Sequence, residues 1–170
     1  TLIADSKQDP NLIIGGTQDQ GFFKYFNGNW VSFALSDGSG CAIDPNDQNT
    51  LYVSGGGEWL TRSSNGGASS VDILPKVNGN KVQGAWFSPI ALNPQNSSIL
   101  FVGGNGNVFM SSNKGTSWAA ISTNLTGGSQ IEFIGNTGTT VYAATNKKVF
   151  KTINNGNNWT EVTSNLPLSN

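Results

Sequence analysis

Residues 111–118 read SSNKGTSW and residues 152–159 read TINNGNNW, and the two stretches share one pattern. A hydroxyl residue begins each stretch, Asn follows two positions later, Gly follows after two more, and Trp ends the stretch. Asn side chains accept hydrogen bonds from nearby backbone N–H groups, and Gly adopts the positive φ angles that tight turns need. The pattern therefore predicts a hairpin loop between two strands, with the Trp packed beneath it.

Two weaker copies of the pattern lie nearer the N-terminus. Residues 63–70, SSNGGASS, keep the hydroxyl, the Asn and the Gly but have Ser in place of Trp, and residues 27–30, NGNW, form a shortened copy. Turn chemistry accounts for every residue of the pattern, so we interpret these residues as structural. The residues of the three longer copies are Ser63, Asn65, Gly67, Ser111, Asn113, Gly115, Trp118, Thr152, Asn154, Gly156 and Trp159.

Apolar segments upstream of these loops repeat with the same period. Four of them align, beginning at residues 12, 51, 100 and 141. Each is preceded by another short apolar stretch and a turn, and is followed by two more short strands. Repeats of about 20 to 50 residues indicate solenoids or propellers. The repeating unit is therefore four antiparallel strands.

A four-stranded unit of this length in tandem predicts the blades of a β-propeller. The expected fold is all-β, with four four-stranded antiparallel sheets over about residues 1–36, 37–84, 85–128 and 129–170. β-branched and aromatic residues punctuated by Gly disfavour a helical solenoid, and a β-sandwich, the main alternative, has no four-strand period. Four blades fit either a small closed ring or an arc of a larger propeller. Because no strand exchange that would close a ring is visible, we favour the arc.

The loops resemble the Asp-box, or BNR, repeat S/TxDxGxxW, with Asn in the place of Asp. The wider pattern, including residues 16–21, GTQDQG, and residues 44–53, DPNDQNTLYV, is similar to blades of sortilin-like (VPS10-type) and xyloglucanase-like propellers of large secreted bacterial proteins. The resemblance covers the whole chain. It implies a secreted or cell-surface protein, whose signal peptide is not in this sequence, in which the boxes are structural and ligands bind the opposite face or the central channel.

The opposite face is where we expect a ligand. In a four-stranded meander, the loops between the second and third strands share one face with the blade-to-blade connections. Trp59 and Trp86 lie in these segments, and we interpret both mainly as packing residues between blades. Amides, carboxylates and an aromatic ring are the materials of a carbohydrate or peptide site. The candidate ligand-binding residues are Gln18, Asp19, Asp37, Glu58 and Trp59.

Composition excludes several classes of function. The net charge is -1 and only 11% of residues are charged, without any basic cluster, so neither nucleic acid nor an anionic membrane is an expected partner. No apolar run is long enough for membrane insertion. The absence of His excludes a His-based triad and a His-ligated metal, and the single Arg62 excludes the three-Arg cluster of a sialidase. We expect no cofactor and no metal, and we interpret Asp44 and Asp47 as turn residues rather than calcium ligands.

The sequence favours a non-catalytic extracellular propeller segment that binds a glycan or a protein, or acts as a scaffold. The remaining blades of a larger parent protein are then expected partners. The alternative is a fragment of an Asp-box glycoside hydrolase, xyloglucanase-like, that contributes part of a polysaccharide-binding cleft. Such enzymes need two carboxylates about 5 to 10 Å apart, and Asp19, Asp37 or Glu58 would supply one of them. Whether the parent is an enzyme stays open.

Overall fold

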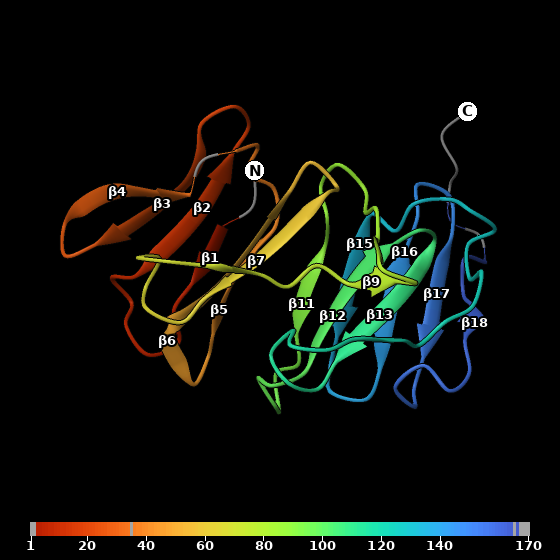
Figure 1. Cartoon of the computed structure of the whole chain (residues 1–170). Helices are drawn as coiled ribbons and strands as arrows, with labels where there is room; N and C mark the ends of the chain where they lie inside the picture. The colour runs from red at the N-terminus through yellow and green to blue at the C-terminus, as the bar shows by residue number, and fades with distance from the viewer. Residues whose placement is uncertain (1–2, 35, 165, 167–170) are drawn as a thin grey trace.

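The computed structural model of the chain describes residues 3–34, 36–164 and 166, and it is built from strands (Figure 1). Residues 1–2 and 167–170, at the outer ends of the first and last predicted repeats, lie outside these residues. Within the described ranges the regular elements are all strands, and the predicted all-β class is confirmed.

The strands form four antiparallel meanders, each with its strands in chain order. The first sheet contains β1 (Ile3–Asp5), β2 (Ile13–Thr17), β3 (Gly21–Phe26) and β4 (Asn29–Ala34), and the second contains β5 (Cys41–Asp44), β6 (Asp47–Gly55), β7 (Trp59–Ser63) and β8 (Val71–Asp72). The third contains β11 (Ile90–Leu92), β12 (Leu100–Gly104), β13 (Asn107–Ser111) and β14 (Ala119–Ala120), and the fourth contains β15 (Phe133–Asn136), β16 (Val141–Ala144), β17 (Val149–Thr152) and β18 (Thr160–Glu161).

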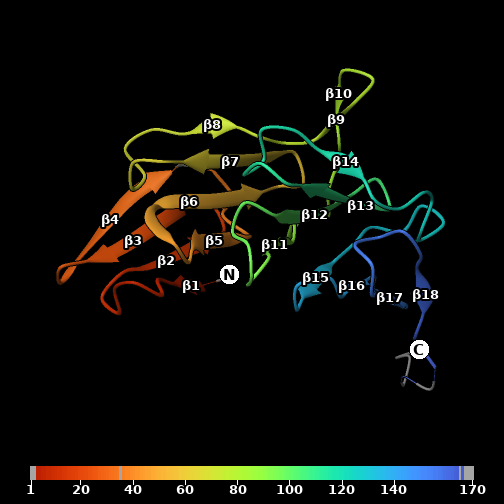
Figure 2. The ribbon, with the colours of Figure 1, turned by 90° about the horizontal axis from the view of Figure 1, so that it is seen from below.

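The four sheets stand side by side as blades of an open arc (Figure 2). Their first strands lie on the inner side, where β1 contacts β5, β5 contacts β11, and β11 contacts β15. Over the described residues, the fourth blade does not return to pack on the first. The predicted blades of a partial propeller are therefore confirmed.

A small hairpin interrupts the regular pattern between the second and third blades. It consists of β9 (Lys76–Val77) and β10 (Asn80–Lys81), and it projects from the outer rim of the arc (Figure 2). Asn78 and Gly79 both adopt positive φ, 51° and 80°, which is the backbone of a tight two-residue hairpin turn.

The structure corrects the alignment of the first repeat by one residue. In β6, Leu51 is buried against the first blade, whereas Tyr52 is buried against the third. In β2 the residue buried against the second blade is Ile14, so Ile14 corresponds to Tyr52 and the repeat begins at Ile13 rather than at Leu12. A one-residue slip exchanges the two faces of a strand, and the run of three apolar residues at positions 12–14 does not define which face is which.

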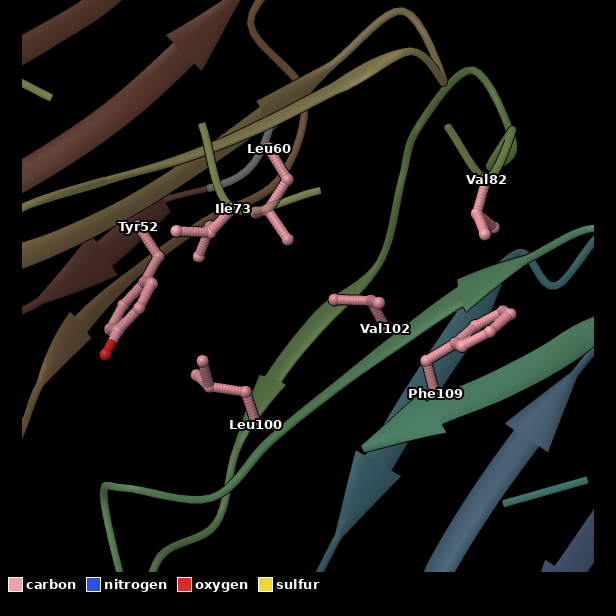
Figure 3. Close-up of a cluster of buried hydrophobic side chains, with 7 residues drawn as sticks. All are labelled: Tyr52, Leu60, Ile73, Val82, Leu100, Val102 and Phe109. Atoms are coloured by element: carbon pink, nitrogen blue, oxygen red, sulfur yellow. The ribbon is translucent and has the colours of Figure 1, made fainter. Parts of the chain in front are cut away.

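Three layers of apolar side chains hold neighbouring blades together. Successive residues of a strand point to opposite sides of the sheet, so each inner blade contributes apolar side chains to the layers on both of its sides. Figure 3 shows the layer between the second and third blades, where Tyr52, Val102 and Phe109 are buried together with Leu60, Ile73, Val82 and Leu100. Burial of one large apolar side chain contributes roughly 1.5 to 3 kcal/mol. The fold therefore depends on contacts between blades at least as much as on the sheets themselves.

Replacement of Phe101 by Ala tests this dependence. Phe101 is fully buried between the third and fourth blades, so Phe101→Ala is expected to lower the free energy of unfolding by roughly 3 to 5 kcal/mol. Phe87→Ala is the matched control, and since Phe87 is 46% exposed we expect a loss below about 1 kcal/mol. Urea unfolding followed by tryptophan fluorescence measures both. Equal losses would contradict a core made between blades.

Candidate ligand-binding face

Three loops on one face of the arc share the same hydrogen bonds. We call residues 63–70, 111–118 and 152–159 the Ser/Thr–Asn–Gly loops. In the second of them, Ser111 Oγ accepts the backbone N–H groups of Asn113 (3.2 Å) and Gly115 (2.8 Å) and donates to Asn113 Oδ1 (2.9 Å). Asn113 Oδ1 also accepts the N–H of Ser117 at 2.8 Å. The loops at Ser63 and Thr152 repeat this set.

Each loop with a Trp is also fastened to the preceding blade. Trp118 Nε1 donates to the carbonyl of Ile73 at 2.7 Å, and Trp159 Nε1 donates to the carbonyl of Ile121 at 2.7 Å. The loop glycine lies against the same residue of the neighbour, since a Cβ on Gly115 would come within 2.5 Å of the Ile73 side chain. The polar groups of the pattern are thus engaged within the fold. The contacts of this face therefore join neighbouring blades.

A cation on the third strand adds a second link between blades. Lys24 Nζ donates to the carbonyl of Gly66 at 2.6 Å, and Arg62 Nη1 donates to the carbonyl of Lys114 at 2.6 Å. Gly66 and Lys114 hold the same place in their loops, and both adopt positive φ, 67° and 56°. The same type of contact therefore joins the first blade to the second and the second to the third.

Asp44 is the most deeply buried charge of the described residues. Its carboxylate is fully buried and forms an ion pair of 2.7 Å with Lys114 of the next blade. Burial raises the pKa of this carboxyl, but the Lys114 ammonium, the Asn46 N–H and the Ser97 hydroxyl together lower that pKa below its ordinary value of 3.8. Asp44 is therefore ionised at neutral pH and links two blades.

The other face carries the turns between second and third strands and the blade-to-blade connections at residues 36–40 and 82–89, and we call it the linker face. Its segments are hydrogen-bonded to one another. The N–H of Gly38 donates to the carbonyl of Thr17 at 3.0 Å, and the N–H of Gly84 donates to the carbonyl of Gly57 at 2.7 Å. The connections are thus held against the turns of the blades beside them.

The structure places the five predicted ligand-binding residues in separate groups. Gln18 and Asp19 are exposed, and the N–H of Asp19 donates to Oδ1 of the half-buried Asp37 at 2.9 Å. Glu58 is exposed one blade further on, where its Oε1 accepts the side-chain amide of Gln83 at 3.2 Å. Trp59 is half-buried, with its ring edge-on to Phe22 at 5.9 Å between centroids, so its ring lies in the layer between the first two blades.

Sequence reasoning missed an exposed aromatic pair on the linker face. Trp86 is expected to pack between blades, but it is 52% exposed, and Phe87 beside it is 46% exposed. The signal for this exposure is that Trp86 and Phe87 lie in a connection without strand alternation, in the stretch QGAWFSP. The strand patterns used to predict burial therefore do not apply to these two residues.

The segment that carries the pair is held on both sides. Ala85 and Ser88 are buried, Ser88 Oγ donates to the Ala85 carbonyl at 2.8 Å, and Ser54 Oγ donates to the Ser88 carbonyl at 2.9 Å. Next to it, the N–H of Gln83 donates to Asn105 Oδ1 at 3.2 Å. The pair is therefore presented on a fixed backbone beside amide groups.

Other kinds of site find little support in the part of the chain that is described. No group of three His, Cys, Asp or Glu side chains gathers there as a metal site would require. Asp47 accepts the Thr50 hydroxyl at 2.7 Å at the beginning of β6. Burial raises the pKa of the Cys41 thiol to about 12, so it stays protonated near neutral pH. None of the described segments is a helix long and apolar enough to cross a bilayer.

Comparison with known proteins agrees with this architecture. The sequence model of a family described as the DUF6242 beta propeller domain matches residues 76–170, which is more than half of the chain. No curated protein matches the sequence significantly.

Solved structures share the fold at low sequence identity. An ancestral GH74 enzyme superposes with a TM-score of 0.75 and 21% identity, over 93% of this chain and 23% of that one. The GH74 xyloglucanase from Xanthomonas campestris superposes with a TM-score of 0.74 and 19% identity, over 98% of this chain and 30% of that one. YCF48 bound to D1 peptide gives a TM-score of 0.58 and 14% identity, over 73% and 39%. The chain thus spans less than a third of the length of either GH74 protein.

Substitution of Lys114 by Met tests the ion pair between blades. It leaves the Asp44 carboxylate buried without its cation, so we expect a loss of about 3 kcal/mol in the free energy of unfolding at pH 7. Lys7→Met is the matched control, because the Lys7–Asp5 pair (3.2 Å) is exposed on both sides and contributes less than about 1 kcal/mol.

The pH dependence of this loss follows from the lowered pKa of Asp44. A carboxyl whose folded-state pKa is depressed stabilises the protein above its unfolded value, and that contribution disappears as pH falls through the folded-state pKa. The difference between wild type and Lys114→Met should therefore narrow below about pH 3.8. Urea titrations at pH 7 and pH 3 measure it. A difference of the same size at both values would mean that the ion pair is not its source.

Proposed function

This chain belongs to the family of DUF6242 beta propeller domains, and from that premise we propose that it is a non-catalytic extracellular propeller segment that binds a glycan on its linker face. The likeness to GH74 propellers supports a shared fold, and one of those neighbours is a xyloglucanase. The surface that would meet the glycan is polar but uncharged, since only 11% of all residues are charged. Neutral polysaccharides suit such a surface.

The observation that carries this proposal is the exposed pair Trp86 and Phe87. Large aromatic rings in water cost free energy, so an exposed pair on a folded protein marks an interaction site. Aromatic faces stack on the C–H faces of sugar rings, and nearby amides bind the hydroxyl groups. Gln83 and Asn105 supply such amides within the same stretch of surface. Because both neighbours of the pair are buried, little conformational freedom is lost on binding.

The carboxylates of the linker face fit a binding role better than hydrolysis. Asp37 holds the turn at Asp19 through an N–H···O bond, and Glu58 accepts the amide of Gln83. Glycoside hydrolysis uses two carboxyls that face each other across the scissile bond. The carboxylates of Asp37 and Glu58 are instead each engaged in a contact that stabilises a loop. Asp19 and Glu58 remain the residues through which the hydrolase alternative is tested.

Loss of the Trp86 ring is expected to weaken glycan binding. Titration calorimetry with soluble xyloglucan, followed by other neutral glucans and mannans, should show binding by the wild type. Trp86→Ala should raise Kd at least tenfold, since each tenfold step corresponds to about 1.4 kcal/mol. Trp30→Ala is the matched control, because Trp30 is 61% exposed but follows the β3–β4 turn, at the opposite end of the strands from the linker face. Equal weakening by both variants would contradict the assignment of the site.

The same preparations decide between binding and hydrolysis. We expect no release of reducing sugar from any of these polysaccharides after prolonged incubation. Turnover that is lost in Asp19→Asn or in Glu58→Gln would instead show that the chain carries a catalytic carboxyl. The glycoside hydrolase interpretation would then replace the present one.

A further inference from the structure

A groove lies at the outer rim of the joint between the third and fourth blades. We call it the rim groove. It has a volume of about 510 Å³ and lies between the chain that leaves β14 and the loop that leads into β18 (Figure 2). Its polar and aromatic lining consists of Ser122, Thr123, Asn155, Asn157, Asn158 and Trp159. None of the described residues that line it carries a charge.

The rim groove is a property of the joint itself. An equivalent groove of about 280 Å³ lies between the second and third blades, which have the first and fourth blades beyond them. There Trp118 takes the place of Trp159, since each indole donates to the carbonyl of the residue that follows an outer strand. The two grooves differ in their chemistry, because the equivalent groove includes the charged side chains of Asp72 and Lys76.

Three amide side chains in the rim groove have no partner in the fold. The backbone N–H groups of Asn155, Asn157 and Asn158 all donate within the fold. Over the described residues, however, their side chains form no hydrogen bond. Asn157 and Asn158 are exposed, and they lie between the Gly and the Trp of the loop pattern, where the pattern fixes no residue. Each free amide offers two N–H donors and one carbonyl acceptor to a ligand.

The other two loops show that the fold does not require these amides. In the second loop, Asn113 Nδ2 donates to Ser117 Oγ at 2.8 Å. In the first loop, Asn65 Nδ2 donates to Ser69 Oγ at 2.9 Å. The third loop has Asn158 in the place of this Ser, and the corresponding hydrogen bond is absent over the described residues. The third loop thus lacks a contact of its own and has exposed amides at the groove, which favours a binding role.

Uncharged amides and hydroxyls beside a Trp ring fit a neutral sugar. Sugar hydroxyls both donate and accept hydrogen bonds, as do the amides of Asn157 and Asn158 and the hydroxyl of the exposed Thr123. The half-buried Trp159 supplies apolar surface for the C–H groups of a sugar ring. A peptide fits less well, because β14 and β18 are two residues long and offer little edge for an added strand.

We propose that the rim groove is a second glycan-binding site, which holds one or two units of a neutral oligosaccharide. Asn157 and Asn158 bind its hydroxyl groups, Thr123 adds a hydroxyl from the opposite wall, and Trp159 packs against a sugar ring. The site shares no residue with the linker face, so it stands independently of the site at Trp86. Its single ring is half-buried, and we therefore expect it to bind more weakly than the pair at Trp86 and Phe87.

NMR titration of ¹⁵N-labelled Trp86→Ala protein tests this inference, because that variant lacks the principal ring of the linker-face site. With cellotetraose or mannotetraose at up to tens of millimolar, the side-chain amide signals of Asn157 and Asn158 should shift. The double variant Asn157→Thr/Asn158→Ser, made in the same background, gives the third loop the residues of the second. It should raise Kd at least tenfold, each tenfold step corresponding to about 1.4 kcal/mol.

Stability and a matched variant separate binding from folding. The double variant restores the hydroxyl that Asn113 uses in the second loop, so its urea unfolding should match or exceed that of its parent. Thr116→Ala is the matched control, because Thr116 holds the position of Asn157 in the equivalent groove. It should leave the sugar affinity unchanged.

Three results would overturn the inference. The amide signals of Asn157 and Asn158 could stay unshifted with both sugars, the stable double variant could bind as tightly as its parent, or Thr116→Ala could weaken binding equally. The linker-face site is judged separately, by comparing wild type with Trp86→Ala. Unshifted amides with a clear effect of Trp86→Ala would remove only the rim groove, and shifted amides without such an effect would remove only the linker-face site.

Discussion

The contact between neighbouring blades is the constraint on which this fold depends, and in two of the three joints a Trp indole donates a hydrogen bond to a backbone carbonyl of the preceding blade. Each four-stranded sheet has apolar residues on both faces, and a single sheet on its own would leave both faces exposed to water. Trp118 and Trp159 bring their loops against Ile73 and Ile121, and the loop glycines remove the Cβ atoms that would keep the blades apart. Blade spacing is thus fixed at the rim, while the apolar layers supply most of the free energy.

This constraint separates the two faces of the arc. On the face that carries the Ser/Thr–Asn–Gly loops, hydroxyl, amide and carbonyl groups form the hydrogen bonds of turns and of contacts between blades, as the Asn113 and Asn154 contacts show. On the linker face, the connections need only reach from the outer strand of one blade to the inner strand of the next. The connection at residues 82–89 can therefore carry an exposed aromatic pair without disturbing a joint.

The periodic part of the structure could be predicted from the sequence, because three copies keep the hydroxyl, Asn and Gly of the loop and the apolar segments recur with the same period. The Asn and Gly of the loops gave the hairpins, and the spacing of apolar segments gave the four-stranded blades. The predictions failed where the repeat carries no information. Three consecutive apolar residues at positions 12–14 do not show which side chains of the first blade face the second. Trp86 and the β9–β10 hairpin lie in a connection that the other blades do not share. Exposure there depends on tertiary packing, which local patterns do not encode.

The outer sides of the first and fourth blades carry exposed apolar side chains. Terminal repeats of a repeat protein are soluble when their outer side is polar, and that requirement is independent of sequence family. Here the outer sides expose Ile3 and Trp30 at one end and Phe133 and Tyr142 at the other, whereas in the interior joints Trp118, at the position of Trp30, is half-buried and Tyr52, at the position of Tyr142, is buried. The blades at both ends keep the residue types of internal blades. Both outer sides are thus built from the residue types of an interior joint and not from those of a polar terminal repeat.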